Sequence, residues 1–201
     1  MLDITQIRSQ FPILEQKING KPLVYFDNAA MAQMPQRVMK RMLEWEGRER
    51  GNIHSGLYSL SQKSTESYQA AREAVARFIG ADEDEIVFVK NTTEAINLVA
   101  YTWARRNLKK GDVILISELE HHSNILPWRM ICDDLGVELQ WIAIDESGQL
   151  TANSEQGWEG LVNEKVKLIA LTHVSNALGT INPIKEIVSL ARKKGIMTLI
   201  D

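Results

Sequence analysis

The sequence predicts an α/β fold, with a mostly parallel sheet covered by helices on both faces. From residue 86 onward, short apolar runs alternate with segments of helical periodicity, a pattern that favours a parallel sheet with crossover helices. The apolar runs lack polar alternation, which is typical of strands buried on both faces. Polar residues follow these runs directly, at the edge of the sheet where open α/β folds bind ligands.

Composition limits the classes of partner. The 201 residues include 44% hydrophobic and 24% charged side chains, which suits a globular core of ordinary size. A net charge of −3 gives no general attraction to nucleic acid or to an anionic membrane, and no signal segment or membrane-spanning run is evident. The single cysteine suits a reducing compartment. We therefore expect a cytoplasmic protein with no nucleic-acid or membrane partner.

The first third of the chain predicts helices separated by turns. Its expected elements are a short helix capped by Asp3, a tight turn at Asn19–Gly20, a strand at 23–26, a helix at 35–49, a surface loop and helix start at 52–64 and a helix ending at Gly80.

The remainder is more regular. Strands are expected at 86–89, 113–116, 137–144, 166–171 and 196–200, with helices at 92–107, 125–135, 155–162 and 183–194. The chain stops at Asp201, directly after an apolar strand, where domains rarely end. We therefore expect the sequence to be the first part of a longer protein, apparently truncated.

The first regular strand leads into a helix start with the features of a phosphate site. Asn91 is a candidate N-cap and Glu94 stands three residues later, which resembles a capping box. The free N–H groups of such a turn, together with the hydroxyls of Thr92 and Thr93, can hold a phosphate without a glycine-rich loop. The alternative is a well-capped helix with no ligand.

Polar side chains that could bind a ligand also follow the other strands, at the same edge of the sheet. His121 follows the second strand, His173 and Asn176 follow the fourth, and Asp201 follows the last. A metal site built from His121, His173 and Asp201 is one alternative, but neither HExxH nor CxxC spacing is present, so we expect no metal. A phosphate site, a flat imidazole, an amide and a carboxylate together favour a phosphorylated heteroaromatic cofactor, and pyridoxal 5'-phosphate fits.

On these residues the sequence resembles the class V aminotransferase group of pyridoxal-phosphate enzymes and, within it, the SufS-type cysteine desulfurases. The matching stretches are FDNAA at 26–30, NIH at 52–54, NTTEAINLV at 91–99, EHHSNILPW at 120–128, THVSNALG at 172–179 and ID at 200–201. The resemblance implies the large cofactor domain of a fold-type I enzyme, with residues 31–201 forming its first part and residues 1–30 an N-terminal segment that packs with a small domain.

The resemblance also implies roles for individual residues. In these roles Thr92 and Thr93 bind the cofactor phosphate, His121 stacks on the ring and assists proton transfer, Asn176 binds the ring hydroxyl, Asp201 pairs with the pyridinium nitrogen, and Ala29, Ala30 and His54 lie near the substrate. The implied reaction converts L-cysteine to L-alanine, and the sulfur passes as a persulfide to a sulfur-acceptor protein for iron–sulfur cluster assembly. The family implies a homodimer.

Two parts of that machinery are expected beyond residue 201: the lysine that forms the Schiff base and the cysteine that carries the persulfide. Cys132 is expected to be buried and inert, so the 201-residue chain alone is expected to be inactive. Ser55 stands where the family usually has arginine, Met31 where serine or threonine is common, and Met34 where lysine is common.

Three alternatives stay open at this point. One is a sister enzyme on the same scaffold, such as a selenocysteine lyase, a kynureninase-like lyase or an epimerase. The second is a catalytically inactive binding module of this length, and the third is a metal-dependent hydrolase.

Overall fold

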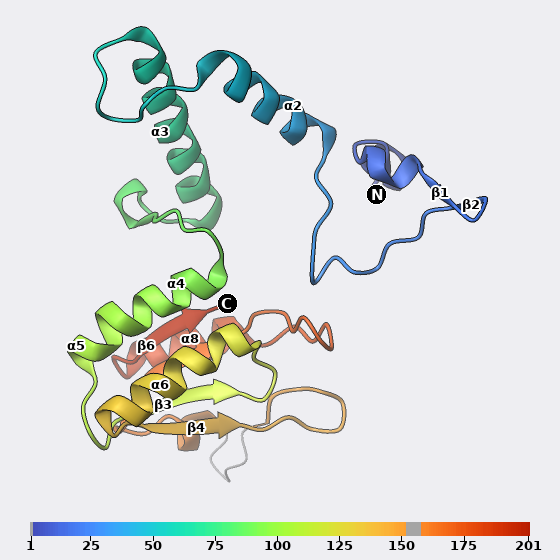
Figure 1. The fold of residues 1–201 in the computed structure, drawn as a ribbon. Helices are drawn as coiled ribbons and strands as arrows, with labels where there is room; N and C mark the ends of the chain where they lie inside the picture. Colours follow the sequence, from blue (N-terminus) through green and yellow to red (C-terminus); the bar gives the residue numbers. More distant parts are fainter. Residues whose placement is uncertain (1, 152–157) are drawn as a thin grey trace. The chain divides into compact units, whose positions relative to one another are not determined.

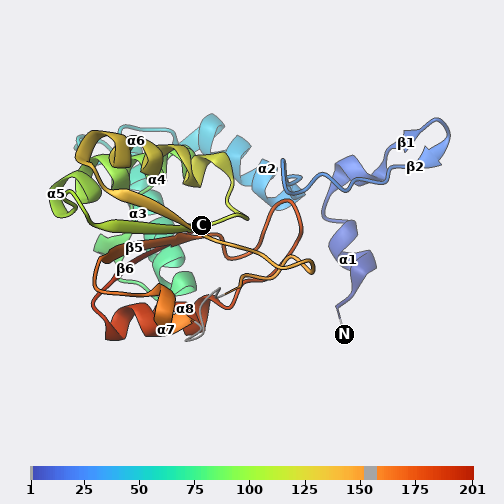
Figure 2. The same cartoon turned by 90° about the horizontal axis from the view of Figure 1, so that it is seen from below.

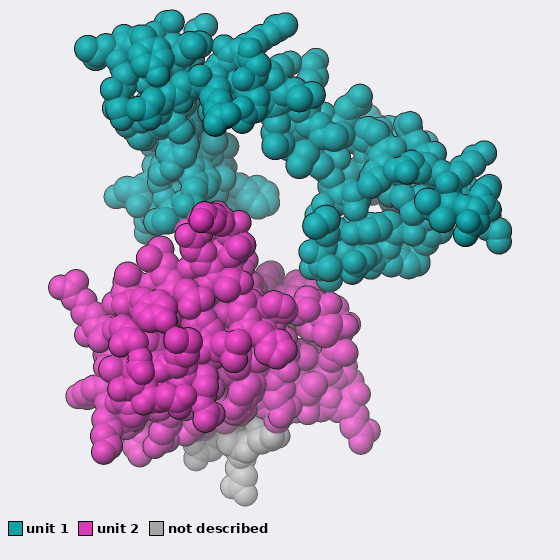
Figure 3. Space-filling model, viewed as in Figure 1, with its two compact units in different colours: residues 1–88 teal, residues 89–201 magenta. Residues whose placement is uncertain are grey.

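The protein divides into two compact units, residues 1–88 and residues 89–201 (Figures 1 and 3). The computed structural model describes residues 2–151 and 158–201. The predicted boundary between residues 30 and 31 concerns the domains of a complete enzyme and stays a prediction.

Helices and turns make up most of the first unit. They are α1 (Ile4–Arg8), α2 (Gln36–Glu44), a π-helical turn (Trp45–Glu49), α3 (Ser59–Ile79) and 3-10 turns at Pro12–Glu15 and Glu83–Glu85. The predicted cap is confirmed, because the Asp3 carboxylate accepts the Gln6 N–H at 3.0 Å. The predicted turn at Asn19–Gly20 is confirmed as well, joining β1 (Lys17–Ile18) to β2 (Lys21–Pro22) with the positive φ angles that such hairpins need.

Two predicted strands, 23–26 and 86–89, are wrong. Both segments are apolar, but a strand also needs a neighbouring backbone for its N–H and C=O groups. Within the part of the chain that the structure describes, neither segment belongs to a sheet. Several of their side chains are open, such as Val87 at 65% and Phe26 at 92% exposed, although Ile86 is buried.

The second unit contains a four-stranded parallel sheet, which confirms the predicted fold class. In spatial order its strands are β4 (Glu138–Ile142), β3 (Val113–Ser117), β5 (Val166–Leu171) and β6 (Met197–Ile200). The helical segments are α4 (Thr92–Val99), a π-helical turn (Ala100–Ala104), α5 (Arg105–Asn107), a 3-10 turn (His122–Asn124), α6 (Leu126–Leu135), α7 (Trp158–Leu161) and α8 (Ile184–Lys193). Residues 155–157 of the helix expected at 155–162 lie outside the described residues.

Helices cover both faces of this sheet, with α4, α5 and α6 on one side and α7 and α8 on the other (Figure 2). Within β3, Ile114 and Ile116 point to the first layer, whereas Val113 and Leu115 point to the second. The register between β3 and β5 shifts by one residue at Lys167, because Val113 pairs with Val166 and Ile114 with Leu168. This irregularity turns Val166 and Leu168 to opposite faces, so both layers are filled.

The ladder between the strands continues past their carboxyl ends. The Asp201 N–H donates to the Leu171 carbonyl at 2.9 Å, and the His173 N–H donates to the Asp201 carbonyl at 2.8 Å. Because β3, β5 and β6 are parallel neighbours, the residues that follow them emerge at one edge of the sheet.

Replacing Leu168 by alanine should lower the free energy of unfolding by about 2–5 kcal/mol, since Leu168 is fully buried and its removal leaves a cavity. The matched control is Leu126→Ala in α6, where the side chain is 56% exposed and the expected change is within about 0.5 kcal/mol, apart from a small gain in helix propensity. Urea unfolding followed by circular dichroism measures both values. Equal losses in the two variants would contradict the assignment of Leu168 to the core.

Candidate active site at the carboxyl ends of the strands

The N-terminus of α4 lies at this edge beside the 3-10 turn at His122–Asn124. The Asn91 side chain accepts the Glu94 N–H at 2.9 Å, which confirms the predicted cap. The Glu94 carboxylate accepts the N–H of Lys90 at 2.7 Å, rather than that of Asn91 as a standard capping box would. Thr92 and Thr93 are exposed in the first turn, whose N–H groups have no partner within a helix. This end of α4 can therefore offer backbone donors and two hydroxyls to an anion.

His121 is exposed, and its ring is oriented by its own turn. Its Nδ1 atom accepts the Ser123 N–H at 3.2 Å and lies 2.7 Å from the Ser123 hydroxyl. A backbone N–H can only donate, so this contact assigns the proton of the neutral imidazole to Nε2. Nε2 is therefore the atom through which His121 can exchange a proton with a ligand.

Asn176 lies in the loop that joins β5 to α8 and is exposed. The loop is ordered by Ser175, whose buried hydroxyl accepts the N–H groups of Ala177 at 3.3 Å and Leu178 at 3.2 Å. The Ser175 N–H in turn donates to the Thr180 carbonyl at 2.9 Å. Asp201, directly after β6, is exposed as well, while its backbone belongs to the ladder. The structure thus brings Thr92, Thr93, His121, Asn176 and Asp201 to one edge.

A buried carboxylate lies behind these exposed groups. Glu120 accepts hydrogen bonds from the Ser117 hydroxyl at 2.5 Å, the Thr172 N–H at 2.9 Å and the Asn124 side-chain amide at 2.7 Å. Asn124 accepts the Trp128 indole N–H at 2.8 Å. Both residues lie in the stretch 120–128 on which the family resemblance rests, but the sequence did not indicate their connection. The spacing of Asn124 and Trp128, four residues apart across a helix start, is the one sequence signal that could have indicated it.

Burial raises the pKa of Glu120 above its usual range, while its hydrogen bonds to Ser117, Thr172 and Asn124 oppose this effect and repulsion from Asp201 adds to it. Burial also raises the pKa of the Cys132 thiol to about 11. Cys132 lies inside α6 among core residues, which confirms the prediction that it is buried, and its thiol is a poor nucleophile at neutral pH.

Ala29, Ala30 and His54 belong to the first unit. Ala29 and Ala30 are exposed in a turn in which the Met31 N–H donates to the Asp27 carbonyl at 3.0 Å. The Tyr25 hydroxyl donates to the Met31 carbonyl at 2.7 Å and holds the end of this turn.

The His54 loop is held by hydroxyl groups of α3. His54 has a left-handed backbone, with φ at 66°, and its N–H donates to the Thr65 hydroxyl at 2.9 Å. Ser61 and Ser64 donate to the carbonyls of Asn52 at 2.5 Å and Glu49 at 2.7 Å. The predicted helix start within 52–64 is confirmed, because α3 begins at Ser59. Ser61 and Ser64, in the first turns of this helix, are buried. Packing against the loop backbone explains the burial of these polar side chains.

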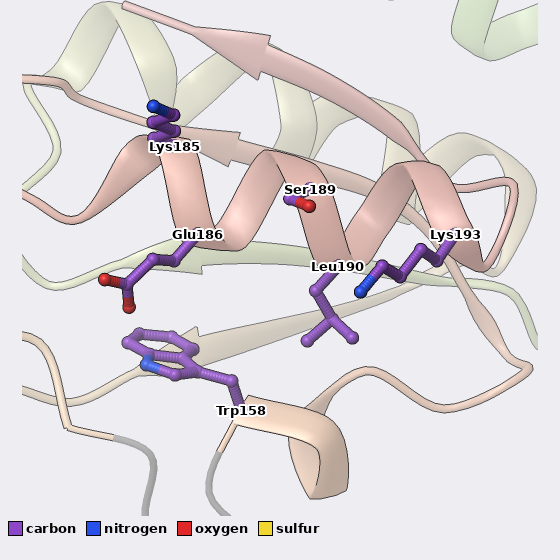
Figure 4. A pocket seen from close by; sticks show the side chains of 6 residues that line it. All are labelled: Trp158, Lys185, Glu186, Ser189, Leu190 and Lys193. Carbon is purple, nitrogen blue, oxygen red and sulfur yellow. The ribbon is translucent and has the colours of Figure 1, made fainter.

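A cavity of about 520 Å³ lies elsewhere, between α7 and α8 (Figure 4). Its lining side chains are Trp158, Lys185, Glu186, Ser189, Leu190 and Lys193. None of these residues was predicted to contact the cofactor or the substrate, and Trp158 and Leu190 also pack against the hydrophobic core.

The described residues contain neither a metal-binding cluster nor a membrane-spanning helix. Among residues 2–151 and 158–201, no three His, Cys, Asp or Glu side chains lie close enough together to hold a metal ion. No helix in the same ranges is both long and apolar enough to cross a membrane.

Comparison with known proteins identifies the family. Residues 24–201 match the aminotransferase class-V family. The chain belongs to this family. A probable cysteine desulfurase of Mycolicibacterium paratuberculosis is 47% identical over 202 residues, and a cysteine desulfurase of Synechococcus elongatus is 46% identical over 200 residues. The apo structure of a cysteine desulfurase from Thermococcus onnurineus NA1 superposes with a TM-score of 0.88 at 37% identity.

This class V chain spans less than half the length of these relatives. The matches cover 100%, 99% and 100% of the chain, but only 29%, 32% and 48% of the Mycolicibacterium, Synechococcus and Thermococcus proteins. The fold described above is therefore only part of the fold of these relatives.

The stability of the protein should depend on pH through Glu120. A raised pKa in the folded state means that this group contributes stability fully below its ordinary value of 4.5, and that the contribution is lost as the pH rises through the raised pKa. The quantity to follow is the difference in unfolding free energy between the unmodified protein and the Glu120→Gln variant. This difference should fall as the pH rises from 4.5 and then level off. Urea unfolding at a series of pH values measures this difference, and a difference that rises with pH would contradict the burial effect.

Proposed function

We propose that the full-length protein is a pyridoxal-phosphate-dependent cysteine desulfurase that converts L-cysteine to L-alanine. The observation that carries the proposal is the meeting of Thr92, Thr93, His121, Asn176 and Asp201 at one edge of a parallel sheet. Family membership and the names of the relatives favour the same conclusion.

The donor set fits pyridoxal phosphate. The first turn of α4 offers N–H groups and hydroxyls to a phosphate, and the Asp201 carboxylate is an acceptor for a protonated ring nitrogen. Asn176 supplies an amide for the ring hydroxyl, and His121 supplies a flat ring for stacking. When bound, the cofactor supplies an electron sink for negative charge that develops on the substrate.

The residues of this chain would then act in distinct ways. Asp201 would hold the proton on the ring nitrogen, because a carboxylate stabilises a neighbouring cation. Asn176 would fix the plane of the ring through a hydrogen bond. His121 would exchange a proton with the substrate at Nε2, because Ser123 occupies Nδ1. The family resemblance assigns contacts with the substrate to Ala29, Ala30 and His54.

Further parts of the proposal rest on the family resemblance. They are a homodimer, a cytoplasmic location, transfer of persulfide sulfur to an acceptor protein and use of that sulfur in iron–sulfur cluster assembly. The lysine of the Schiff base and the cysteine that carries the persulfide are assigned to the part of the relatives that this chain does not span. Cys132 is not a candidate for the second role, because it is buried and its pKa is raised.

The test uses the full-length protein, purified with pyridoxal phosphate and supplied with L-cysteine. We expect a visible absorbance band from the bound cofactor and equimolar alanine and transferred sulfur. Cofactor binding with no alanine would overturn the desulfurase assignment, and selenocysteine, kynurenine and amino-acid racemisation assays would then identify a sister activity. Absence of cofactor binding would overturn the proposal as a whole.

Removal of the two hydroxyls at the start of α4 should weaken cofactor binding. In the double variant Thr92→Val and Thr93→Val, the lost hydrogen bonds to a charged phosphate should raise the Kd for pyridoxal phosphate by at least about tenfold. Thr102→Val is the matched control, because Thr102 lies in the π-helical turn that follows α4 and its hydroxyl donates to the Leu98 carbonyl. Fluorescence titration measures the three Kd values, and an equal Kd for the double variant and the control would count against a phosphate site here.

A further inference from the structure

Glu120 connects three separate elements through its carboxylate. It is only 8% exposed, and its three donors belong to the end of β3 (Ser117), the residue that follows β5 (Thr172) and the turn before α6 (Asn124). Asn124 and Trp128 are fully buried and extend the connection into α6. None of these side chains is exposed for direct contact with a ligand.

The direction of every hydrogen bond in this chain of contacts is fixed. The Trp128 indole can only donate, so the Asn124 carbonyl oxygen faces Trp128 and its NH₂ group faces Glu120. The Leu119 N–H donates to the Ser117 hydroxyl oxygen at 3.2 Å, and the Ser117 hydroxyl donates to Glu120. The Thr172 N–H can only donate as well. Glu120 therefore has to be an acceptor on both oxygens.

The same network leads to the exposed residues of the edge. Glu120 directly precedes His121 in the chain. On the other strand, the Thr172 carbonyl accepts the Asn182 side-chain amide at 2.8 Å, and the His173 N–H donates to the Asp201 carbonyl. The carboxylate thus joins the backbone that carries His121 to the backbone that leads to Asn176 and Asp201.

We propose that Glu120 is a positioning residue: its buried carboxylate fixes His121 relative to the strand ends that carry Asn176 and Asp201. This inference rests on the proposed function for the identity of the positioned groups. The hydrogen-bond network itself is independent of the proposed function.

Glu120→Gln in the full-length protein is the decisive variant. A glutamine has one acceptor oxygen and one NH₂ group, so its NH₂ group has to face a donor. If it faces Asn124, that amide has to turn and present its own NH₂ to the Trp128 indole N–H. If the NH₂ group faces Thr172, it meets the Thr172 N–H, and two donors then face each other. If it faces Ser117, the Ser117 hydroxyl hydrogen has to turn away. The matched control is Glu118→Gln, because Glu118 is exposed and, among residues 2–151 and 158–201, accepts a hydrogen bond only from the Ile144 N–H, at 3.1 Å.

Two kinds of measurement separate positioning from stability. In protein without cofactor, Glu120→Gln should shift the indole N–H resonance of Trp128, assigned by its loss in Trp128→Phe. In protein loaded with pyridoxal phosphate, it should shift the absorbance maximum of the cofactor and lower kcat/KM for cysteine by on the order of 100-fold, as displacement of a reacting group by about 1 Å does. Glu118→Gln should change neither readout.

The outcomes are distinct. A lower melting temperature of Glu120→Gln with an unchanged absorbance maximum and unchanged kcat/KM would overturn the positioning role and leave a purely structural one. If Glu120→Gln does not fold, Trp128→Phe decides, since it frees Asn124 to turn and should shift the absorbance maximum in the same direction; no shift would overturn the inference. If the unmodified protein binds no cofactor, the proposed function fails, whereas the indole resonance still tests the network.

Discussion

Burial of both faces of the parallel sheet is the constraint on which the candidate site depends. The four residues 113–116 of β3 are almost completely buried, so the N–H and C=O groups of this strand have to be satisfied by its neighbours β4 and β5. A slip of one residue would exchange the side chains of the two helical layers, which fixes the register. Ser117 and Thr172 therefore end their strands at matching levels, close enough for one carboxylate to reach both.

The residues at this edge divide into a buried polar set and an exposed set. Glu120 is buried and points back into the protein, whereas its neighbour His121 is exposed. Similarly, Ser175 is buried and holds its loop, whereas Asn176 is exposed beside it. Buried groups thus determine where the proposed ligand-binding groups lie. Such support reduces the reorganisation that binding or catalysis would otherwise need.

The sequence alone was enough to predict the strands whose pairing is determined by hydrophobic burial. The strands at 113–116 and 166–171 were predicted to within one residue, because unbroken apolar runs bounded by turns have few other arrangements. The runs at 23–26 and 86–89 have similar composition but form no strand among the described residues, since pairing depends on residues distant in the sequence. The Glu120 network could not be predicted for the same reason, because Thr172 lies 52 residues away.

The charge of the buried Glu120 interacts with the charge of the exposed Asp201. Glu120 and Asp201 are both carboxylates, and their repulsion contributes to the raised pKa of Glu120. A protonated ring nitrogen bound by Asp201 would offset that negative charge, and the ionised form of Glu120 would become less costly. Because such coupling is reciprocal, ionised Glu120 would in turn favour a cation at Asp201. A buried acid that fixes the backbone of the edge would thereby also contribute to the charge preference of the proposed cofactor site.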